Sequence, residues 1–538
     1  MKAIKTKEYL ETTKLTYKYD SLIIDFSFNW DNSYEKLYDF FNDIFNISCN
    51  LDLDIIKPYF KDWSNIDGEA SMLVRPKSNL ECAIILKTSF ECSIPITICA
   101  GQTNLTGSAT PNGGIVLSTS LLTIPDVKID NKLMIVNVGV GIPLEIMRNK
   151  ILKLTKNKFY YPVDPTSRHD AFVGGTLSCN ASGFIPGEKG ATRYWVDGIE
   201  LLLPNGDKIK AKRGQYISKK GFFKLEYNNK SIKLNVPTYK RPSIKNASGL
   251  FSNVNGEIDF IDLIIGSEGI LGLLVSCSLK LEKRPKDYLE LFICLANENE
   301  AINLHDYLYD YFDSNLGNLS ALEYFGYNSQ KYMKNKNFLF KNDTDVGVYI
   351  QIPIYNSNIE IICDEWVSIL SDFNNKINLD SIIVLNDPLN WKKFFDARHS
   401  IPDNALRKTK QLGGVSIITD TIVPPNNYKE YITKVHKKLQ MHNIEYLLFG
   451  HLGDCHLHFH LIPSKGQRDM ALEVYNYMID LSAKLGGVYS AEHGTGKRKR
   501  NDFKKCYGHE AIQMIQLLKQ KIDPCFLLNR GNIVEPLD

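Results

Sequence analysis

Hydrophobic positions recur at helical spacing over the first 65 residues, where aromatic side chains are frequent, as in residues 33–45. That spacing predicts a helical segment at residues 1–65. From about residue 66 the pattern changes to short apolar runs separated by glycine-rich turns, and it keeps this character to about residue 285. Many short strands joined by such turns predict a mixed α+β domain over residues 66–285.

Several elements of this domain can be predicted from the same pattern. Residues 79–93 have helical apolar spacing and lead into a β-rich run at residues 94–101. Asn205 and Gly206 form a strong hairpin signal within an apolar run. Further strands are expected at residues 113–118, 133–140 and 199–209.

A second alternation of apolar runs begins near residue 288. Residues 288–296 and 347–355 are typical of strands, and helical segments lie between them. This pattern predicts a separate sheet-and-helix domain over residues 286–395. The remaining residues, 396–538, contain a histidine-rich strand and an apolar helix.

Composition and charge narrow the classes of protein. The chain has 538 residues, 43% of them hydrophobic and 23% charged, which is typical of globular proteins. A net charge of +3 is too small to indicate a nucleic-acid partner. The basic run at residues 496–505 is expected to be a solvated face, with contact to an anionic membrane surface as the alternative. The 11 cysteines include no CxxC pair, which argues against iron–sulfur clusters, zinc ribbons and a disulfide framework.

Targeting signals are not evident in the sequence. The first 20 residues lack the apolar core of a signal peptide, and no uninterrupted apolar stretch is long enough to span a bilayer. We therefore expect a cytoplasmic protein without a transmembrane segment, and peripheral contact with a membrane remains an alternative.

Four segments rich in small residues follow one another within the first α+β region. The first, residues 100–117, holds four glycines and three threonines and carries no charge. Glycine allows backbone to lie close against a ligand, and free N–H groups in such turns bind anions such as phosphate. The alternative is a pair of tight turns between strands. Comparable segments occur at residues 164–195, 245–252 and 263–274.

Taken together, these segments resemble the FAD-linked oxidases of the vanillyl-alcohol-oxidase type. The first resembles the family pattern GxTxLxGxxxPxGG, the second resembles PxDPxS and GGxxxxNAxG, and the last resembles GSEGxLG. A close of the form DPxxxxNxGxI stands at residues 523–533. The resemblance implies that FAD binds to these residues: Gly101, Gln102, Thr103, Asn104, Leu105, Gly107, Pro165, Ser167, Gly174, Gly175, Asn180, Ala181, Gly183, Gly266, Glu268, Gly269 and Asn529.

Residues 449–463 contain four of the 11 histidines. His456, His458 and His460 alternate with apolar residues, so the period of two places them on one face of a strand. Glu492 and His493 stand next to each other later in the chain. Imidazole and carboxylate groups suit zinc or another divalent metal. The alternative is a half-exposed strand with polar histidines.

These residues resemble the subgroup of the same family that acts on 2-hydroxy acids, with its patterns GHxGDxxxH and EHGxG. The resemblance implies that His451, His458 and Glu492 bind a divalent metal, either Zn or else Mn or Fe. It also implies that His493 is the catalytic base and that Arg398 binds the substrate carboxylate. Two positions depart from the family: His456 stands where an Asn is frequent, and Ile418 where some members have Lys.

The resemblance implies an α+β fold in which a two-part FAD-binding domain (66–285) is followed by a substrate or cap domain (286–395). A C-terminal segment (396–538) then completes the active site. The expected activity is FAD-dependent oxidation of a D-2-hydroxy acid resembling D-lactate. Its electron acceptor would be a quinone, an electron-transfer flavoprotein or a cytochrome. Two alternatives stay open: a metal-free FAD oxidase of an alcohol or sugar, and a catalytically silent flavoprotein that binds a partner.

Overall fold

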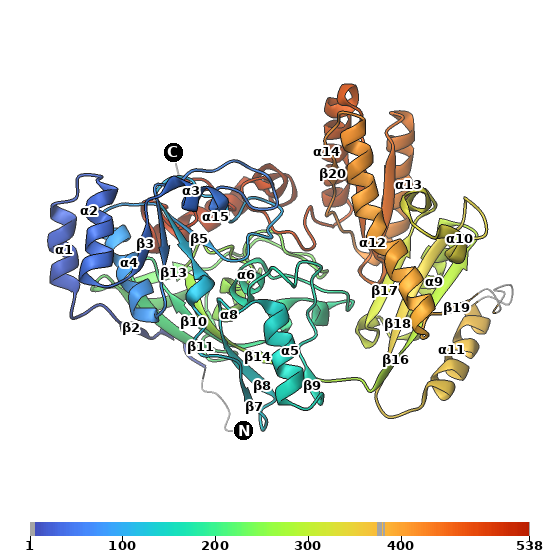
Figure 1. Ribbon diagram of the computed structural model, residues 1–538, viewed down its shortest axis with the longest axis horizontal. Helices are drawn as coiled ribbons and strands as arrows, with labels where there is room; N and C mark the ends of the chain where they lie inside the picture. Colours follow the sequence, from blue (N-terminus) through green and yellow to red (C-terminus); the bar gives the residue numbers. More distant parts are fainter. Residues whose placement is uncertain (1–5, 374–378, 380–381, 537–538) are drawn as a thin grey trace.

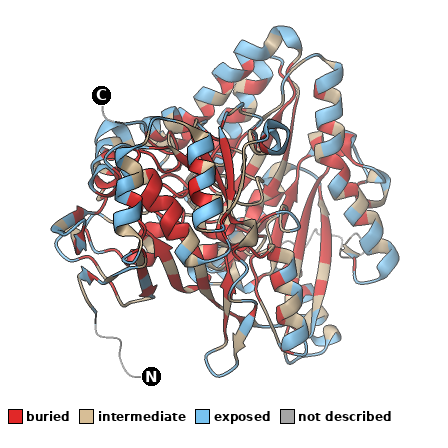
Figure 2. Ribbon diagram, turned by 60° about the vertical axis from the view of Figure 1, so that its left-hand side comes forward, coloured by how far each residue is buried: buried red, intermediate tan, exposed pale blue. Residues whose placement is uncertain are grey.

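The computed structural model describes residues 6–373, 379 and 382–536, and these form two lobes (Figure 1). The α+β class is confirmed, because each lobe combines sheets with helices. Buried positions follow the sheets and the inner faces of the helices in both lobes (Figure 2). Among the described residues, no helix combines the length and the apolar character needed to cross a membrane.

The larger lobe is built on two main sheets. One has the strand order β3-β4-β6-β5, in which β4, β6 and β5 are parallel and β3 is antiparallel. The other is antiparallel, with the order β2-β11-β10-β14-β8-β7. The bounds of these strands are β2 (Thr12–Lys14), β3 (Ser48–Asn50), β4 (Met72–Arg75), β5 (Ile96–Cys99), β6 (Ile115–Ser118), β7 (Lys128–Asp130), β8 (Ile135–Gly139), β10 (Val196–Leu202), β11 (Asp207–Lys212) and β14 (Leu273–Lys280).

Two smaller sheets and eight helices complete the segment up to residue 285. The small sheets are β1 (Tyr9–Leu10) with β12 (Phe222–Tyr227) and β13 (Lys230–Asn235), and β9 (Phe159–Tyr160) with β15 (Glu282–Lys283). The helices are α1 (Asp20–Phe28), α2 (Tyr34–Asp39), α3 (Leu53–Ile56), α4 (Asn79–Glu91), α5 (Leu144–Leu154), α6 (Val173–Cys179), α7 (Thr192–Trp195) and α8 (Phe260–Ile264).

Local sequence explains several of these elements. Helix α4 begins at Ser78, whose hydroxyl accepts a hydrogen bond from the N–H of Glu81, as an N-cap residue should. The predicted hairpin at Asn205 and Gly206 is confirmed, because β10 and β11 pair across it and Gly206 has a φ of +84°. The N-terminal segment is less helical than expected, since β2 adds a strand to the edge of the six-stranded sheet.

The smaller lobe contains one seven-stranded sheet, in the order β19-β16-β18-β17-β21-β22-β20. Its strands are β16 (Asp287–Leu295), β17 (Ala321–Phe325), β18 (Val346–Ile354), β19 (Ile383–Val384), β20 (Ile417–Ile418), β21 (Tyr446–His451) and β22 (His456–Leu461). Its longer helices are α9 (Glu298–Tyr311), α11 (Ile359–Phe373), α12 (Pro388–Gln411), α13 (Pro425–Met441) and α14 (Arg468–Lys484), with the short α10 (Lys336–Leu339) beside α12. The expected division between residues 395 and 396 falls inside α12, and strands from both sides of it share this sheet.

Alternation along the strands assigns each face of this sheet to different helices. Leu289 and Leu291 of β16 belong to the core cluster with α9, α11, α13 and α14, whereas Phe292 packs with residues of α12. Strand β22 follows the same rule, because Leu457 and Phe459 enter the first cluster. Its histidines therefore point to the opposite face.

After α14 the chain returns to the larger lobe. Helix α15 (Arg500–Ile522) contributes Phe503, Ile515 and Leu518 to the core of that lobe and lies beside its sheets (Figure 1). The residues after α15 then run along β5, where the N–H of Ile96 donates to the carbonyl of Leu527. Residues 500–536 thus belong to the larger lobe in space.

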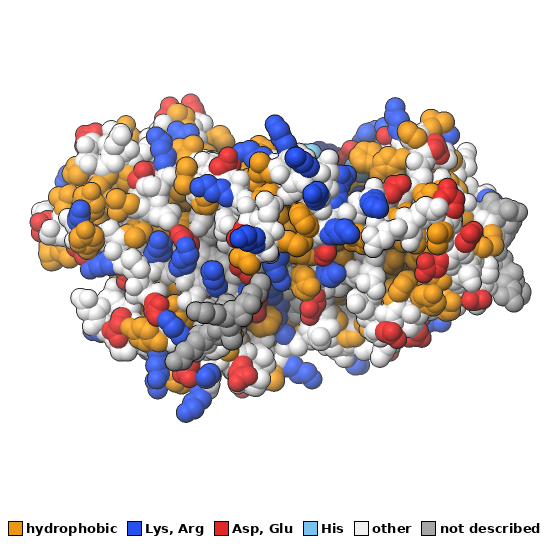
Figure 3. Space-filling model, turned by 90° about the horizontal axis from the view of Figure 1, so that it is seen from below, with side chains coloured by type: hydrophobic (Ala, Val, Ile, Leu, Met, Phe, Trp, Pro, Cys, Tyr) orange, Lys and Arg blue, Asp and Glu red, His pale blue; other side chains and the backbone are white. Residues whose placement is uncertain are grey.

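The basic run at residues 496–505 is only partly the solvated face that the sequence suggested: Arg498, Lys504 and Lys505 are exposed, whereas other cations of the run are not. The Lys497 ammonium donates to the backbone carbonyl of Thr110 at 2.8 Å, and the buried Lys499 pairs with Asp420 at 2.9 Å. These cations join the C-terminal segment to other parts of the chain. Elsewhere, basic side chains are scattered among acidic and apolar ones, as on the face in Figure 3.

Candidate active site

A cavity of about 920 Å³ lies between the two lobes. The larger lobe lines it with three of the four small-residue segments, at residues 100–117, 164–195 and 263–274. The smaller lobe lines it with residues of β17, α12, β21 and β22. Glu492 and His493, which follow α14, complete the lining. The segments that resemble a flavin site and those that resemble a metal site therefore share one cavity.

The residues expected to bind FAD divide into two groups. Three of them, Gly107, Asn180 and Gly266, are not among the cavity-lining residues, and Asn180 instead accepts a hydrogen bond from the N–H of Arg193. The others line the cavity: Gly101, Gln102, Thr103, Asn104, Leu105, Pro165, Ser167, Gly174, Gly175, Ala181, Gly183, Glu268, Gly269 and Asn529.

The wall that these residues form suits a dinucleotide. At Gly101, a Cβ would lie 2.0 Å from the carbonyl oxygen of Asp170, so only glycine lets the two lining loops approach this closely. Most of these residues are glycines or carry hydroxyl or amide side chains, which can approach a pyrophosphate without charge repulsion. The cavity volume is at the upper end of the range for cofactor sites.

Asn529 and Glu268 hold this wall together. The Asn529 amide accepts a hydrogen bond from the N–H of Ile98 at 2.7 Å and donates to the carbonyl of Glu268 at 2.7 Å. The Glu268 carboxylate accepts hydrogen bonds from the N–H groups of Thr495 and Gly496, at 2.6 and 2.8 Å. Both residues therefore act by joining the C-terminal segment to the loops that line the cavity.

Replacing Asn529 with alanine is expected to destabilise this junction. It leaves the part-buried N–H of Ile98 without a partner, which costs about 1–3 kcal/mol, and it removes one of the two amide donors to the Glu268 carbonyl. Thermal unfolding and FAD titration would measure the loss. The variant Asn529→Asp keeps the acceptor for Ile98 but turns an oxygen toward the Glu268 carbonyl, so it should also lose stability; wild-type stability in Asn529→Ala would contradict this assignment.

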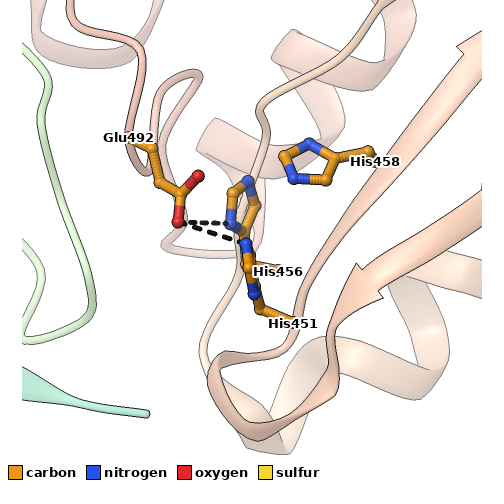
Figure 4. A group of neighbouring side chains, drawn as sticks. All are labelled: His451, His456, His458 and Glu492. Atoms are coloured by element: carbon orange, nitrogen blue, oxygen red, sulfur yellow. Dashed lines mark ion pairs between the residues drawn. The ribbon is translucent and has the colours of Figure 1, made fainter. Parts of the chain in front are cut away.

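Strands β21 and β22 bring the metal-type ligands together. Their antiparallel register places His451 opposite His456, and His458 follows two residues later on the same face. Glu492 approaches from the segment after α14, and its Oε1 lies 3.3 Å from His451 Nε2 (Figure 4). Four residues form what we call the metal-type group: His451, His456, His458 and Glu492. One ligand atom from each lies within 4.8 Å of those from the other three.

The chemistry of these four side chains fits a divalent metal. Burial lowers the pKa of His458 to about 3, so this imidazole is neutral, as a ligand must be. Burial also disfavours charge on His451, but the carboxylates of Glu323 and Glu492 outweigh it and raise the pKa of His451 to about 10. A metal ion would replace that proton. Sequence reasoning included His451, His458 and Glu492 in the ligand set and left His456 out.

Glu323 of β17 is a functional residue that sequence reasoning missed. It is buried, and its carboxylate lies 2.7 Å from His451 Nδ1 and 3.1 Å from Arg398 Nη2. Burial alone would raise the pKa of Glu323, but His451 and Arg398 lower it to about 2. The sequence did contain one indication of this role: Glu323 is the single charged residue in the apolar run at residues 321–325. A charged side chain is rarely buried without a partner.

Arg398 projects from α12 into the same cavity. Its guanidinium pairs with Glu323 and lies over the ring of Phe184 from the larger lobe, 4.6 Å from the ring centroid. These contacts fix the side chain while it still offers further N–H groups. A guanidinium held in this way can bind a carboxylate with two parallel hydrogen bonds.

His493 lies beside the metal-type group. Its ring is nearly parallel to that of His458, with centroids 5.8 Å apart. Its Nδ1 lies 3.5 Å from Asp420 Oδ2, and the same oxygen accepts the N–H of His493 at 3.0 Å. Burial lowers the pKa of His493, so the ring is neutral near pH 7 and can accept a proton.

Two more buried residues support the site. Asp420 accepts a hydrogen bond from the N–H of Glu492 at 3.2 Å and pairs with Lys499. Lys245 lies in the third small-residue segment, and its ammonium pairs with Glu492 and, at 3.2 Å, with Asp454. The sequence alone assigned no role to Asp420 or to Lys245, although both lie in segments that it singled out.

Comparisons with known proteins agree with this arrangement. Residues 70–212 match the family described as FAD binding domain, and residues 328–533 match the family described as FAD linked oxidases, C-terminal domain. D-lactate dehydrogenase of Anaerostipes hadrus is 24% identical over 493 residues, which cover 89% of this chain and 93% of the relative. D-2-hydroxyglutarate dehydrogenase of Stutzerimonas stutzeri is 24% identical over 497 residues, 90% and 95% of the two chains.

Solved structures are similar in fold. The structure of p-cresol methylhydroxylase with substrate bound has a TM-score of 0.67 at 14% identity, covering 94% of this chain and 98% of that one. The chain is an FAD-linked oxidoreductase, and it belongs to the FAD-linked oxidases, with an FAD binding domain followed by the C-terminal domain of that family.

Proposed function

We propose that this protein oxidises a D-2-hydroxy acid to the corresponding 2-oxo acid with FAD and a divalent metal. One observation carries the proposal: Arg398, His493 and three metal-type residues line the same cavity as the segments that resemble a flavin site, the three being His451, His458 and Glu492. The relatives named D-lactate dehydrogenase and D-2-hydroxyglutarate dehydrogenase support the class of substrate.

Each side chain has a distinct task in this proposal. When bound, FAD is the hydride acceptor, and a divalent metal held by His451, His458 and Glu492 lowers the pKa of the substrate hydroxyl. Arg398 binds the substrate carboxylate and so orients Cα toward the wall of the larger lobe. His493 accepts the hydroxyl proton at Nε2, because its Nδ1 faces Asp420.

The cavity favours a monocarboxylate with an apolar side chain. Among its described lining residues, the only Lys or Arg side chains are Arg398 and Arg168, and Arg168 pairs with Glu145 at 3.2 Å. The lining around Arg398 is aromatic and aliphatic, with residues from α12 and its neighbours: Tyr349, Trp391, Phe394, Phe395, Pro402, Ile418 and Phe449. A second carboxylate would find no unpaired Lys or Arg among the described lining residues.

Anaerobic mixing of the FAD-loaded protein with 2-hydroxy acids tests this proposal. D-lactate and D-2-hydroxyisocaproate should bleach the flavin absorbance faster than D-2-hydroxyglutarate, and the L-enantiomers should be slow. Removing metal with a chelator should abolish bleaching, and adding Zn²⁺ or Mn²⁺ should restore it. Bleaching by alcohols or sugars that survives chelation would instead favour a metal-free oxidase.

A further inference from the structure

We propose that His456 is a fourth protein ligand of the metal, bound through Nδ1 and oriented by Asp420, an inference that rests on the proposed metal site. His456 is completely buried, and its Nδ1 has no hydrogen-bond partner among the described residues. An imidazole nitrogen left unsatisfied in the interior is costly. A metal ion bound to one nitrogen would remove that cost.

The backbone places this ring in the metal-type group. His456 is the cross-strand partner of His451, and its ring centroid lies 5.6 Å from that of His451 and 4.6 Å from that of His458. Its Nδ1 lies 3.9 Å from Glu492 Oε1, the oxygen that also faces His451 (Figure 4). A single ion could therefore contact all four side chains.

The groups around the three imidazoles identify which nitrogens are free. His451 Nδ1 lies 2.7 Å from a Glu323 oxygen, and His458 Nδ1 lies 3.2 Å from the carbonyl oxygen of Thr419. His456 shows the same arrangement through its other nitrogen, because Nε2 lies 3.1 Å from Asp420 Oδ1.

Metal-binding histidines usually donate their second ring N–H to a carboxylate or carbonyl in this way. All three rings thus have an acceptor on the outer side and a free nitrogen on the inner side.

A fourth protein ligand changes what the metal can do. Three imidazoles and one carboxylate fill a tetrahedral zinc site, whereas catalytic zinc usually keeps one position open. The substrate can then reach the metal only if the coordination number rises to five or six. The inference therefore favours an ion that accepts five or six ligands readily, such as Mn²⁺ or Fe²⁺.

Metal binding to the FAD-loaded protein tests the inference directly. In His456→Asn the dissociation constant for Co²⁺, measured by competition with a chelator, should rise by at least about tenfold, because even loss of an outer partner of a ligand costs 10–100-fold. The visible absorption of bound Co²⁺ should also change, since it depends on coordination number. His460→Asn is the matched control: this buried histidine lies on the same strand, outside the four-residue group, and should leave both readouts unchanged.

Other outcomes separate the two proposals. If the wild-type protein binds no divalent metal, the metal part of the proposed function fails and this inference fails with it. If the wild type binds Co²⁺ and His456→Asn keeps the same affinity and spectrum, only the fourth ligand is wrong. X-ray absorption of the metal in the wild-type protein gives an answer that does not depend on a folded variant: three imidazoles support the inference, and two overturn it.

Discussion

Replacing His493 with asparagine is expected to slow reduction of the flavin by a D-2-hydroxy acid by about 10²- to 10⁴-fold, the usual contribution of a positioned general base. Asparagine has no ring, so the variant lacks Nε2, the nitrogen of His493 that faces away from Asp420 and would accept the proton. FAD should remain bound, because His493 is joined to the first small-residue segment through its backbone. Its carbonyl accepts a hydrogen bond from the Thr106 hydroxyl at 3.3 Å, and the substitution keeps that carbonyl. Anaerobic stopped-flow absorbance at the flavin band measures the rate.

His399→Asn is the control for loss of an imidazole near the cavity. His399 is exposed on α12, and its Nδ1 contacts the carbonyl of Phe395 at 2.9 Å. Its loss should leave flavin reduction nearly unchanged. A rate in His493→Asn equal to that of the wild type, with FAD and metal still bound, would remove His493 from the role of base.

The fold was predictable where local pattern decides it. Period-two alternation in residues 456–461 correctly placed apolar side chains on one face of a strand and histidines on the other. Helical spacing in residues 79–93 likewise gave α4. The expected domain boundary at residue 395 shows where local pattern fails. Residues 417–461 complete a sheet that begins at residue 287, and the order of strands in a sheet depends on long-range pairing.

The outer part of the candidate site was hidden for a related reason. Glu323 comes from β17 and Lys245 from a loop of the larger lobe, and nothing in the local sequence of either shows its partner. His456 stood out as a departure from the family, but its orientation depends on Asp420. The basic run was predictable only in part, because Lys497 and Lys499 pair with a carbonyl and a carboxylate that are distant in sequence.

These hidden residues share a common arrangement. Three buried carboxylates at the site each pair with a cation: Glu323 with Arg398, Asp420 with Lys499 and Glu492 with Lys245. A charge buried without a partner would cost several kcal/mol, so each cation allows a carboxylate to stay ionised near the metal-type group. Of the three, Asp420 is the carboxylate that faces the proposed base, His493, and it also faces His456.

Replacing Asp420 with asparagine should therefore harm both stability and activity. It leaves the Lys499 ammonium buried without its carboxylate, which is expected to cost about 3–5 kcal/mol. It also removes the group that orients His493, so flavin reduction should slow by about 10²- to 10⁴-fold, as for loss of the base itself. Chemical denaturation and stopped-flow flavin reduction measure the two effects separately.

The double variant Asp420→Asn with Lys499→Met separates positioning from charge balance. Removing both partners of a buried pair is far less costly than removing one, so the free energy of unfolding should recover. Flavin reduction should stay slow, because His493 still lacks its carboxylate. Lys499→Met alone keeps Asp420 and its hydrogen bonds to the N–H groups of Glu492 and His493, so it should lose stability but much less activity. Full recovery of the rate in the double variant would mean that Asp420 serves only as the partner of Lys499.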